Sequence, residues 1–329
     1  MTEGRMRWMQ QVYAAVQGYV PLARPHSPCY NGSSTRKEVR PLLYLSRFTF
    51  PSQERESFFF HGPHRQCYNT YYPFGVIAKF DATILEFEPV TILYGGNGCG
   101  KSTALNVIAE KLGLLRDARY NRSNFFEDYV NLCEAETRQP VPAHSRIITS
   151  DDVFDYMLNL RALNEGVDER REEIFREYQE DNDKVNPFRF RTMEDYDRLK
   201  RVNMARRMTS SAYTKARLAP NVREQSNGES ASFYFTSRIQ DGGLYLLDEP
   251  ENSLSPTKQT ELLKYLEDSA RFFGCQFIIA THSPFLLAMR GARIYDMEAD
   301  PIRPRKWTEL EAVRTYHDFF KQHEMDFPD

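Results

Sequence analysis

A glycine-rich stretch in the first third of the chain has spacing typical of phosphate binding. Gly95, Gly100, Lys101 and Ser102 fit the pattern G-x-x-x-x-G-K-[ST], with an apolar run before it and helical spacing after it. Glycine is needed where consecutive backbone N–H groups curl around phosphate oxygens, and the N-terminus of the following helix faces the same oxygens. We therefore expect Lys101 to reach the β- and γ-phosphates of a nucleotide and the Ser102 hydroxyl to bind Mg²⁺. The residues predicted to hold the phosphates are Gly95, Asn97, Gly98, Cys99, Gly100, Lys101, Ser102 and Thr103.

Two carboxylates stand at the end of a second apolar run, GLYLLDEP over residues 243–250. Asp248 and Glu249 would lie at the C-terminal end of a buried strand, where α/β sheets bind their ligands. Asp248 is expected to bind Mg²⁺ directly or through a water molecule, and Glu249 to polarise an attacking water as a general base. A third apolar run, FIIATHSP over residues 277–284, ends in His282, which is expected at the same edge, against the γ-phosphate or the attacking water.

Two smaller features near the glycine-rich stretch leave alternatives open. Cys99 could be a redox-sensitive thiol, but a small residue filling a small space is the favoured interpretation. One of the upstream aromatic residues Tyr71, Tyr72 and Phe74 could stack on an adenine ring, although core packing is favoured for them.

Strand-like and helical patterns alternate at both ends of the sequence, around a charged and weakly apolar middle. This order predicts an α/β fold with a mostly parallel sheet flanked by helices and a helical subdomain inserted at about residues 116–225. The folded domain is expected over residues 41–329. Residues 1–40 are rich in Pro, Ser and Gly toward their end, which predicts an N-terminal extension, a linker or a disordered lead.

The charge distribution limits the kinds of partner. The formal net charge of the 329 residues is −3, so a nucleic-acid partner would need a local basic patch. A basic helical stretch offers one, made of Lys200, Arg201, Arg206, Arg207, Lys215 and Arg217. These side chains could bind nucleic-acid phosphate, but ion pairs with the acidic residues in 168–183 on a solvated helical face are the favoured interpretation.

The sequence also bears on the location of the protein. It contains no apolar run long enough to span a bilayer and no apolar core of a signal peptide, so no membrane segment and a cytoplasmic location are expected. Its five cysteines are scattered and odd in number, which argues against a disulfide framework.

Together with a fourth motif, these pieces resemble a known family. SNGES, residues 226–230, precedes an apolar helical pattern, and Ser226 could cap that helix. GGNGCGKST, SNGES, LYLLDEP, NSLS and THSP follow one another as the Walker A, signature, Walker B, D-loop and switch-histidine motifs do in ATP-binding cassette (ABC) ATPases. The sequence resembles most closely the soluble SMC/RecF-like branch and the bacterial predicted AAA family ATPases.

The resemblance implies a P-loop NTPase fold of ABC type and a homodimer that sandwiches two ATP molecules with Mg²⁺. The signature residues Ser226 and Gly228 would then face the γ-phosphate held by the Lys101 of the other chain. In the same comparison Glu249 is the catalytic base and His282 the switch histidine.

Two departures from the family pattern stand out. The signature contains Ser-Asn-Gly-Glu where the family usually has a motif closer to L-S-G-G-Q, which argues against a standard transporter subunit. No glutamine stands clearly at the Q-loop position. The stretch expected there offers Ser150, Asp151 and Asp152, and Gln139 is a poor second candidate.

The sequence therefore predicts a Mg²⁺-dependent ATPase whose dimer drives a conformational change in a partner protein or a nucleic-acid process. The alternative is an ATP-binding switch with slow turnover that works with a nuclease or toxin in bacterial defence. A nucleotide-binding subunit of a transporter is the least favoured function.

Overall fold

The computed structural model describes residues 42–61, 68, 70–78, 84–183, 188, 192–218 and 227–327. The chain divides into two compact units. The described residues of the larger unit lie within 42–155 and 227–327, and those of the smaller unit within 156–218. The expected N-terminal extension, residues 1–40, falls outside the described residues.

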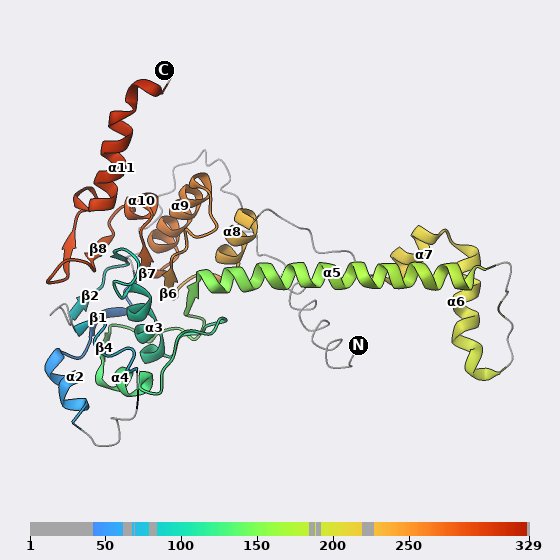
Figure 1. Ribbon diagram of the computed structural model, residues 1–329, viewed down its shortest axis with the longest axis horizontal. Helices are drawn as coiled ribbons and strands as arrows, with labels where there is room; N and C mark the ends of the chain where they lie inside the picture. The colour runs from blue at the N-terminus through green and yellow to red at the C-terminus, as the bar shows by residue number, and fades with distance from the viewer. Residues whose placement is uncertain are drawn as a thin grey trace. The chain divides into compact units, whose positions relative to one another are not determined.

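The larger unit is built on a sheet with the strand order β5-β6-β7-β3-β8-β9 (Figure 1). The strands are β3 (Val90–Tyr94), β5 (Arg146–Thr149), β6 (Leu244–Asp248), β7 (Gln276–Thr281), β8 (Arg293–Asp296) and β9 (Arg303–Arg305). The pairs from β5 to β8 are parallel, and β9 runs antiparallel to β8. Every residue of β3 and β7 is buried, which explains why these strands read as continuous apolar runs in the sequence.

The register of this sheet brings the predicted motifs to one edge. In the parallel pairs, Thr149 lies opposite Asp248, Asp248 opposite Ala280, and Thr281 opposite Tyr94. The loops that follow β3, β6 and β7 therefore leave the sheet side by side, although they are far apart in the sequence.

Helices cover this sheet and pack next to the edge where the loops after β3, β6 and β7 leave it. Helix α3 (Lys101–Leu112) packs against β5, β6 and β7, and it is buried on almost every side from Thr103 to Ala109. It ends at Gly113, whose left-handed backbone (φ 63°) lets its N–H bond the last carbonyls of the helix. The other helices of the larger unit are α2 (Gln53–Phe59), α4 (Phe126–Leu132), α8 (Asn227–Arg238), α9 (Pro256–Phe272), α10 (Pro284–Leu287) and α11 (Glu311–Gln322), with short 3₁₀ turns at Trp307–Glu309 and Glu324–Asp326.

Helix α11 stands out from the rest of the larger unit (Figure 1). It exposes aromatic side chains, among them Tyr316, Phe319 and Phe320.

A smaller antiparallel sheet, β2-β1-β4, is joined to the main sheet in part by a buried glutamine. Its strands are β1 (Leu45–Thr49), β2 (Ile84–Glu86) and β4 (Glu134–Thr137). Gln276 begins β7 and is fully buried. Its Oε1 accepts hydrogen bonds from the backbone N–H of Tyr44 (2.8 Å) and of Leu45 (2.9 Å), and its Nε2 donates to the Leu45 carbonyl (2.8 Å). The polar groups of the β1 backbone are thus satisfied by a side chain of the main sheet.

Replacing Gln276 by leucine is expected to destabilise the larger unit by at least about 3 kcal/mol. The substitution would leave three buried backbone groups without partners, and each unsatisfied group costs about 1–3 kcal/mol. Urea denaturation of Gln276→Leu measures the loss, with Gln322→Leu on the exposed side of α11 as the control. A loss below about 1 kcal/mol would contradict this role for Gln276.

The smaller unit is helical. It contains the part of α5 (Ser150–Asp181) from Tyr156 onward, a 3₁₀ turn at Met193–Asp195, α6 (Tyr196–Arg207) and α7 (Ser210–Arg217). The sequence predicts a helical insert from about residue 116, but residues 116–155 belong to the larger unit. The physical reason is that this segment carries β4, which pairs with β1, and β5, which pairs with β6.

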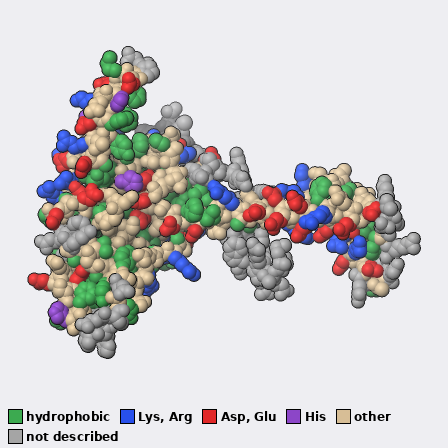
Figure 2. Space-filling model, in the orientation of Figure 1, with side chains coloured by type: hydrophobic (Ala, Val, Ile, Leu, Met, Phe, Trp, Pro, Cys, Tyr) green, Lys and Arg blue, Asp and Glu red, His purple; other side chains and the backbone are tan. Residues whose placement is uncertain are grey.

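Acidic and basic side chains pair within the smaller unit, as the sequence predicted. Arg217 lies 2.7 Å from Glu177, and Arg201 lies within 4 Å of both Glu177 and the buried Asp181. Figure 2 shows acidic and basic side chains side by side over α5, α6 and α7. Part of the basic stretch is therefore neutralised inside the unit.

In the part of the chain that the structure describes, no helix combines the length and the apolar composition needed to cross a membrane.

Candidate functional site

The loop between β3 and α3 has the geometry of a phosphate-binding loop. Gly100 caps α3 in the left-handed region (φ 99°), and a Cβ there would come within 3.1 Å of the Val76 side chain. Gly95 has a φ of 154°, and a Cβ at this position would stand 2.6 Å from the Cys99 sulfur. Both positions therefore require glycine, the residue that a phosphate-binding loop needs where its backbone turns.

Lys101 points its ammonium group back into this loop. The residue is 4% exposed, and its Nζ donates hydrogen bonds to the carbonyls of Gly95 (2.7 Å) and Gly96 (2.9 Å). The same nitrogen lies 3.9 Å from Oε1 of Glu249. A buried cation thus connects the glycine-rich loop with the acidic pair at the end of β6.

Ser102 and Asp248 meet across the two motifs. The Ser102 hydroxyl donates a hydrogen bond of 3.0 Å to Oδ1 of Asp248. Burial, together with the negative charge of Glu249, raises the pKa of Asp248 to about 6 against the hydrogen bond from Ser102. The carboxylate therefore lies in a place where a nearby cation would stabilise its charged form.

This raised pKa predicts how stability depends on pH. Below about pH 4 Asp248 is protonated in both the folded and the unfolded chain, so it contributes nothing. As the pH rises toward 6, the unfolded chain ionises while the folded chain keeps its proton, so Asp248 progressively destabilises the fold. The full cost, reached above the folded pKa, is about 3 kcal/mol.

The Asp248→Asn variant lacks this titration. Its free energy of unfolding should therefore gain up to about 3 kcal/mol relative to the wild type between about pH 4 and pH 7. Urea denaturation at several pH values, without metal or nucleotide, measures the difference. Asp155→Asn, at an exposed position of α5, is the control. A difference between wild type and Asp248→Asn that stays constant with pH would contradict the assignment.

Glu249 is held in place at the sheet edge, directly after β6. Its backbone has a positive φ of 48°, and its N–H donates to the Ala280 carbonyl of β7 (2.9 Å). Its Oε2 accepts a hydrogen bond from Asn252 (3.0 Å), and its Oε1 lies 4.0 Å from Nδ1 of His282. The strained turn after β6 thus directs this carboxylate toward both Lys101 and His282.

Three residues that the sequence did not assign to the site contact it. Asn252 contacts Glu249, and Glu251, two residues after Glu249, contacts the turn that carries His282. Glu298, which follows β8, accepts a hydrogen bond of 2.8 Å from the N–H of Gly96. Glu251 is the third acid of the sequence DEPEN, residues 248–252, and neither its contact with the turn nor that of Glu298 with the loop is indicated by the local sequence.

The signature motif is only partly described. Ser226 lies outside the described residues, and α8 begins at Asn227, so Gly228 stands in the first helical turn. The polar loop predicted for residues 226–230 is thus helical from Asn227 onward. Asp117 holds α8 in place within the larger unit. It accepts a hydrogen bond from the Tyr234 hydroxyl (2.9 Å) and forms an ion pair with Arg238 (3.1 Å).

The stretch where the sequence placed the Q-loop contains a structural carboxylate. Asp152 is buried, and its Oδ2 accepts hydrogen bonds from the N–H (2.6 Å) and the hydroxyl (2.8 Å) of Thr149, the last residue of β5. Ser150 and Asp151 begin α5 directly after it. Gln139 lies in the loop after β4, which belongs to the other sheet.

The structure bears on the two alternatives that the sequence left open near the loop, the role of the upstream aromatic residues and that of Cys99. Phe74 is buried in the core and stacks on Phe59 (4.5 Å between ring centroids), which confirms core packing for that residue. The Tyr72 hydroxyl donates to Thr103 in the first turn of α3 (3.1 Å). Cys99 is buried, and its burial raises the pKa of its thiol, which disfavours a reactive thiolate.

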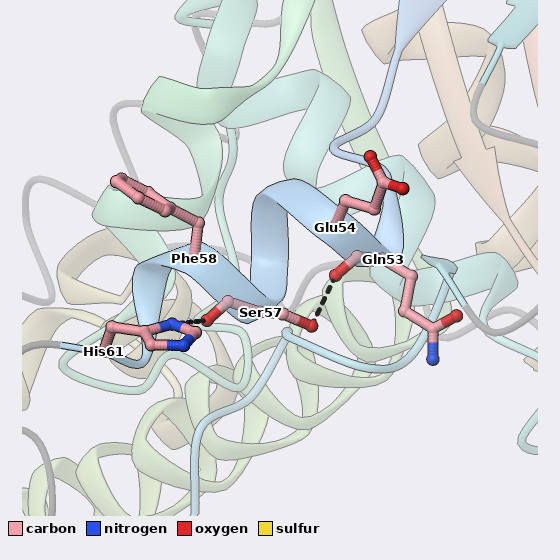
Figure 3. A pocket seen from close by; sticks show the side chains of 5 residues that line it. All are labelled: Gln53, Glu54, Ser57, Phe58 and His61. Carbon is pink, nitrogen blue, oxygen red and sulfur yellow. Dashed lines mark hydrogen bonds between the residues drawn. The ribbon is translucent and has the colours of Figure 1, made fainter.

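A hollow of about 390 Å³ lies away from these residues, on α2. Gln53, Glu54, Ser57, Phe58 and His61 line it, and Figure 3 shows that all of them come from one helix and the residues after it. None of the residues assigned to the phosphate-binding loop or the acidic pair takes part in it.

The oxygen donors at the sheet edge suit a magnesium ion. Within the described ranges, no three His, Cys, Asp or Glu side chains gather closely enough to hold a metal by themselves. Mg²⁺ usually takes one or two protein oxygens and completes its shell with waters and substrate phosphates. Ser102 and Asp248, joined at 3.0 Å beside the loop, fit that requirement.

The parallel sheet, the loop after β3 and the acidic end of β6 have the arrangement that the motifs of a P-loop NTPase predict. A family model described as "AAA domain, putative AbiEii toxin, Type IV TA system" matches residues 220–288. The matched segment contains α8, the acidic pair and His282. A search of curated proteins gives no match.

Solved structures similar to this chain include ABC ATPases and an SMC head. The Smc head domain with an extended coiled coil bound to the C-terminal domain of ScpA, from Pyrococcus furiosus, is 12% identical with a TM-score of 0.37, over 73% of this chain and 95% of that one. A dimeric ATP-binding cassette bound to ADP and Pi is 13% identical with a TM-score of 0.33, over 69% and 91%. A putative metal-chelate type ABC transporter in an inward-facing conformation is 17% identical with a TM-score of 0.35, over 71% and 82%. Likenesses at this level do not indicate a shared assembly or partner.

Proposed function

We propose that this chain binds ATP and hydrolyses it to ADP and phosphate in a Mg²⁺-dependent reaction. The observation that carries the proposal is the meeting of Ser102 with Asp248 (3.0 Å) and of Lys101 with Glu249 (3.9 Å) at one edge of the sheet. These contacts join the phosphate-binding loop to the two carboxylates that hydrolysis needs.

Each side chain has a role that follows from its position. Lys101 neutralises charge on the β- and γ-phosphates once its bonds to the loop carbonyls give way to phosphate oxygens. Ser102 and Asp248 would hold Mg²⁺, which would offset the negative charge of the phosphates. Glu249 accepts the proton of the water that attacks the γ-phosphate. His282 lies beside Glu249, with its Nδ1 4.0 Å from Oε1, and there it can contact the γ-phosphate or orient that water.

The direct test is nucleotide binding followed by turnover. A fluorescent ATP analogue titrated with and without Mg²⁺ measures binding, and phosphate release from ATP measures hydrolysis. A wild-type protein that binds no ATP in the presence of Mg²⁺ would refute the proposal.

We also propose that two copies of the chain enclose the nucleotides between them. The support is the position of the signature motif at the start of α8, where helix N–H groups are available to an anion, as the resemblance to ABC ATPases implies. Light scattering on the Glu249→Gln protein with and without Mg-ATP tests this. A mass that doubles with ATP supports the dimer, and a mass that stays at the 38.6 kDa of one chain refutes it.

We propose that ATP binding and hydrolysis act on a partner, either an effector protein or a nucleic acid, and that this takes place in the cytoplasm. The matching family is described as a putative toxin of a toxin–antitoxin system, which favours an effector. The smaller unit offers the exposed basic residues Arg206, Arg207 and Lys215 for an anionic partner.

A second candidate function is a binding switch with slow turnover. The observation that favours it is that both oxygens of Glu249 are engaged, one with Asn252 (3.0 Å) and the other near Lys101 (3.9 Å), so the base must be released before it can accept a proton. Comparison of a single turnover with the steady state separates the two functions. A slow single turnover favours the switch, and a fast one favours the ATPase.

A further inference from the structure

Glu251 is a buried acid whose hydrogen bonds converge on the turn after β7. It is 6% exposed. Its Oε1 accepts hydrogen bonds from the Thr281 hydroxyl (2.6 Å), the His282 N–H (2.9 Å) and the Ser283 N–H (3.2 Å). Three donors on one oxygen fix the backbone of this turn in a single conformation.

We propose that Glu251 is the positioning residue that holds His282 beside Glu249, an inference that rests on the proposed ATPase function. Nδ1 of His282 lies 3.5 Å from Oε1 of Glu251 and 4.0 Å from Oε1 of Glu249. The His282 side chain is 49% exposed, so packing does not orient it. Its direction is therefore set by the turn, and Glu251 sets the turn.

The far side of the turn is anchored separately. The Ser283 hydroxyl donates to Oε1 of Gln259 on α9 (2.7 Å), and it also accepts the Leu286 N–H at the start of α10. Glu251 thus holds the side of the turn that faces Glu249, while Gln259 holds the side that faces α9.

The cost of burying Glu251 argues for a role beyond packing. Its Oε2 is buried without a hydrogen-bond partner among the described residues. A buried carboxylate with an unpaired oxygen is costly, and an apolar side chain of similar size would avoid that cost. What an apolar side chain cannot supply is the acceptor for the three donors of the turn.

The kinetic test compares four variants with the wild type. Glu251→Leu keeps the volume and removes the acceptor, whereas Glu251→Gln keeps an acceptor oxygen. His282→Ala and the double variant Glu251→Leu/His282→Ala complete a double-mutant cycle. Glu267→Gln is the matched control, because Glu267 is an acid on α9 whose Oε1 accepts a backbone N–H, that of Arg290.

Glu251→Leu is expected to lower kcat by about 100-fold, because misplacing a reacting group by a small distance has an effect of this size. The affinity of Glu251→Leu for ATP should stay within about threefold of that of the wild type. The hydrogen bonds that Glu251 makes to described residues go to the turn after β7 and not to the phosphate-binding loop. Glu251→Gln should restore most of the activity. In the His282→Ala background Glu251→Leu should cost nothing more, which a merely structural role would not produce. An additional loss in the double variant, or full activity of Glu251→Leu, overturns the proposal.

A second measurement needs no ATPase activity. Amide hydrogen exchange of the free protein reports on the N–H groups of His282 and Ser283 directly. Exchange at the His282 N–H should be at least about tenfold faster in Glu251→Leu, and unchanged in Glu251→Gln and Glu267→Gln. The Ser283 N–H should respond less, because it also donates to the Thr281 hydroxyl (3.0 Å). Unchanged exchange in Glu251→Leu overturns the positioning role. A wild type without turnover, together with faster exchange in Glu251→Leu, refutes the proposed function and keeps the role of Glu251 in the turn.

Discussion

Lys101→Ala is expected to weaken ATP binding by roughly 10- to 100-fold and to abolish measurable turnover. A hydrogen bond to a charged group contributes about 1.5–3 kcal/mol, which corresponds to that range of affinity. Lys101 is the buried cation of the loop, 4% exposed, and its removal leaves the phosphates facing the carboxylates of Asp248 and Glu249 without compensation. Titration of a fluorescent ATP analogue into the variant measures the loss.

Lys111→Ala is a matched control for this experiment. Lys111 belongs to the same helix, α3, and its Nζ also donates to a backbone carbonyl, that of Val130 (3.2 Å), far along the helix from the loop. Its replacement should leave the affinity for ATP within about twofold of the wild type. Equal affinities in Lys101→Ala and Lys111→Ala would remove Lys101 from the phosphate site.

Glu249→Gln is expected to bind ATP within about threefold of the wild type and to lower kcat by roughly 100- to 10,000-fold. The amide keeps the shape of the side chain and can still contact Asn252, but it cannot accept a proton from water at neutral pH. Loss of a general base acts on the transition state and leaves the bound ground state nearly unchanged. Phosphate release under saturating ATP measures kcat, and the fluorescent analogue measures binding.

The control for Glu249→Gln is Glu261→Gln. Glu261 is an acid on α9 that forms an ion pair with Lys258 in the same helix (2.6 Å). Both variants remove one negative charge from the larger unit, so a general electrostatic effect would appear in both. Normal turnover by Glu249→Gln would exclude Glu249 as the base and leave the acidic pair with a metal-binding role only.

The sequence by itself determined the fold class and the local motifs of this protein. Continuous apolar runs predicted β3, β6 and β7, because strands buried on both faces have no polar side to alternate with. The loop from Gly95 to Ser102 was predicted because its backbone demands glycine at particular positions, and such demands are written locally in the sequence. Ion pairs between the basic stretch and the acidic residues of α5 were predicted from charge and helical spacing.

Only the tertiary structure decided which distant residues meet. The contacts of Ser102 with Asp248 and of Glu298 with Gly96 join residues separated by 146 and 202 positions, and they depend on the strand order of the sheet. The smaller unit begins only at Tyr156 because the preceding strands β4 and β5 pair with β1 and β6 of the larger unit. A local pattern of charge and helical spacing carries no information about such pairing. Glu251 was an unremarkable acid in the sequence, and it became a candidate positioning residue only when folding buried it and brought three donors from the β7 turn to one of its oxygens.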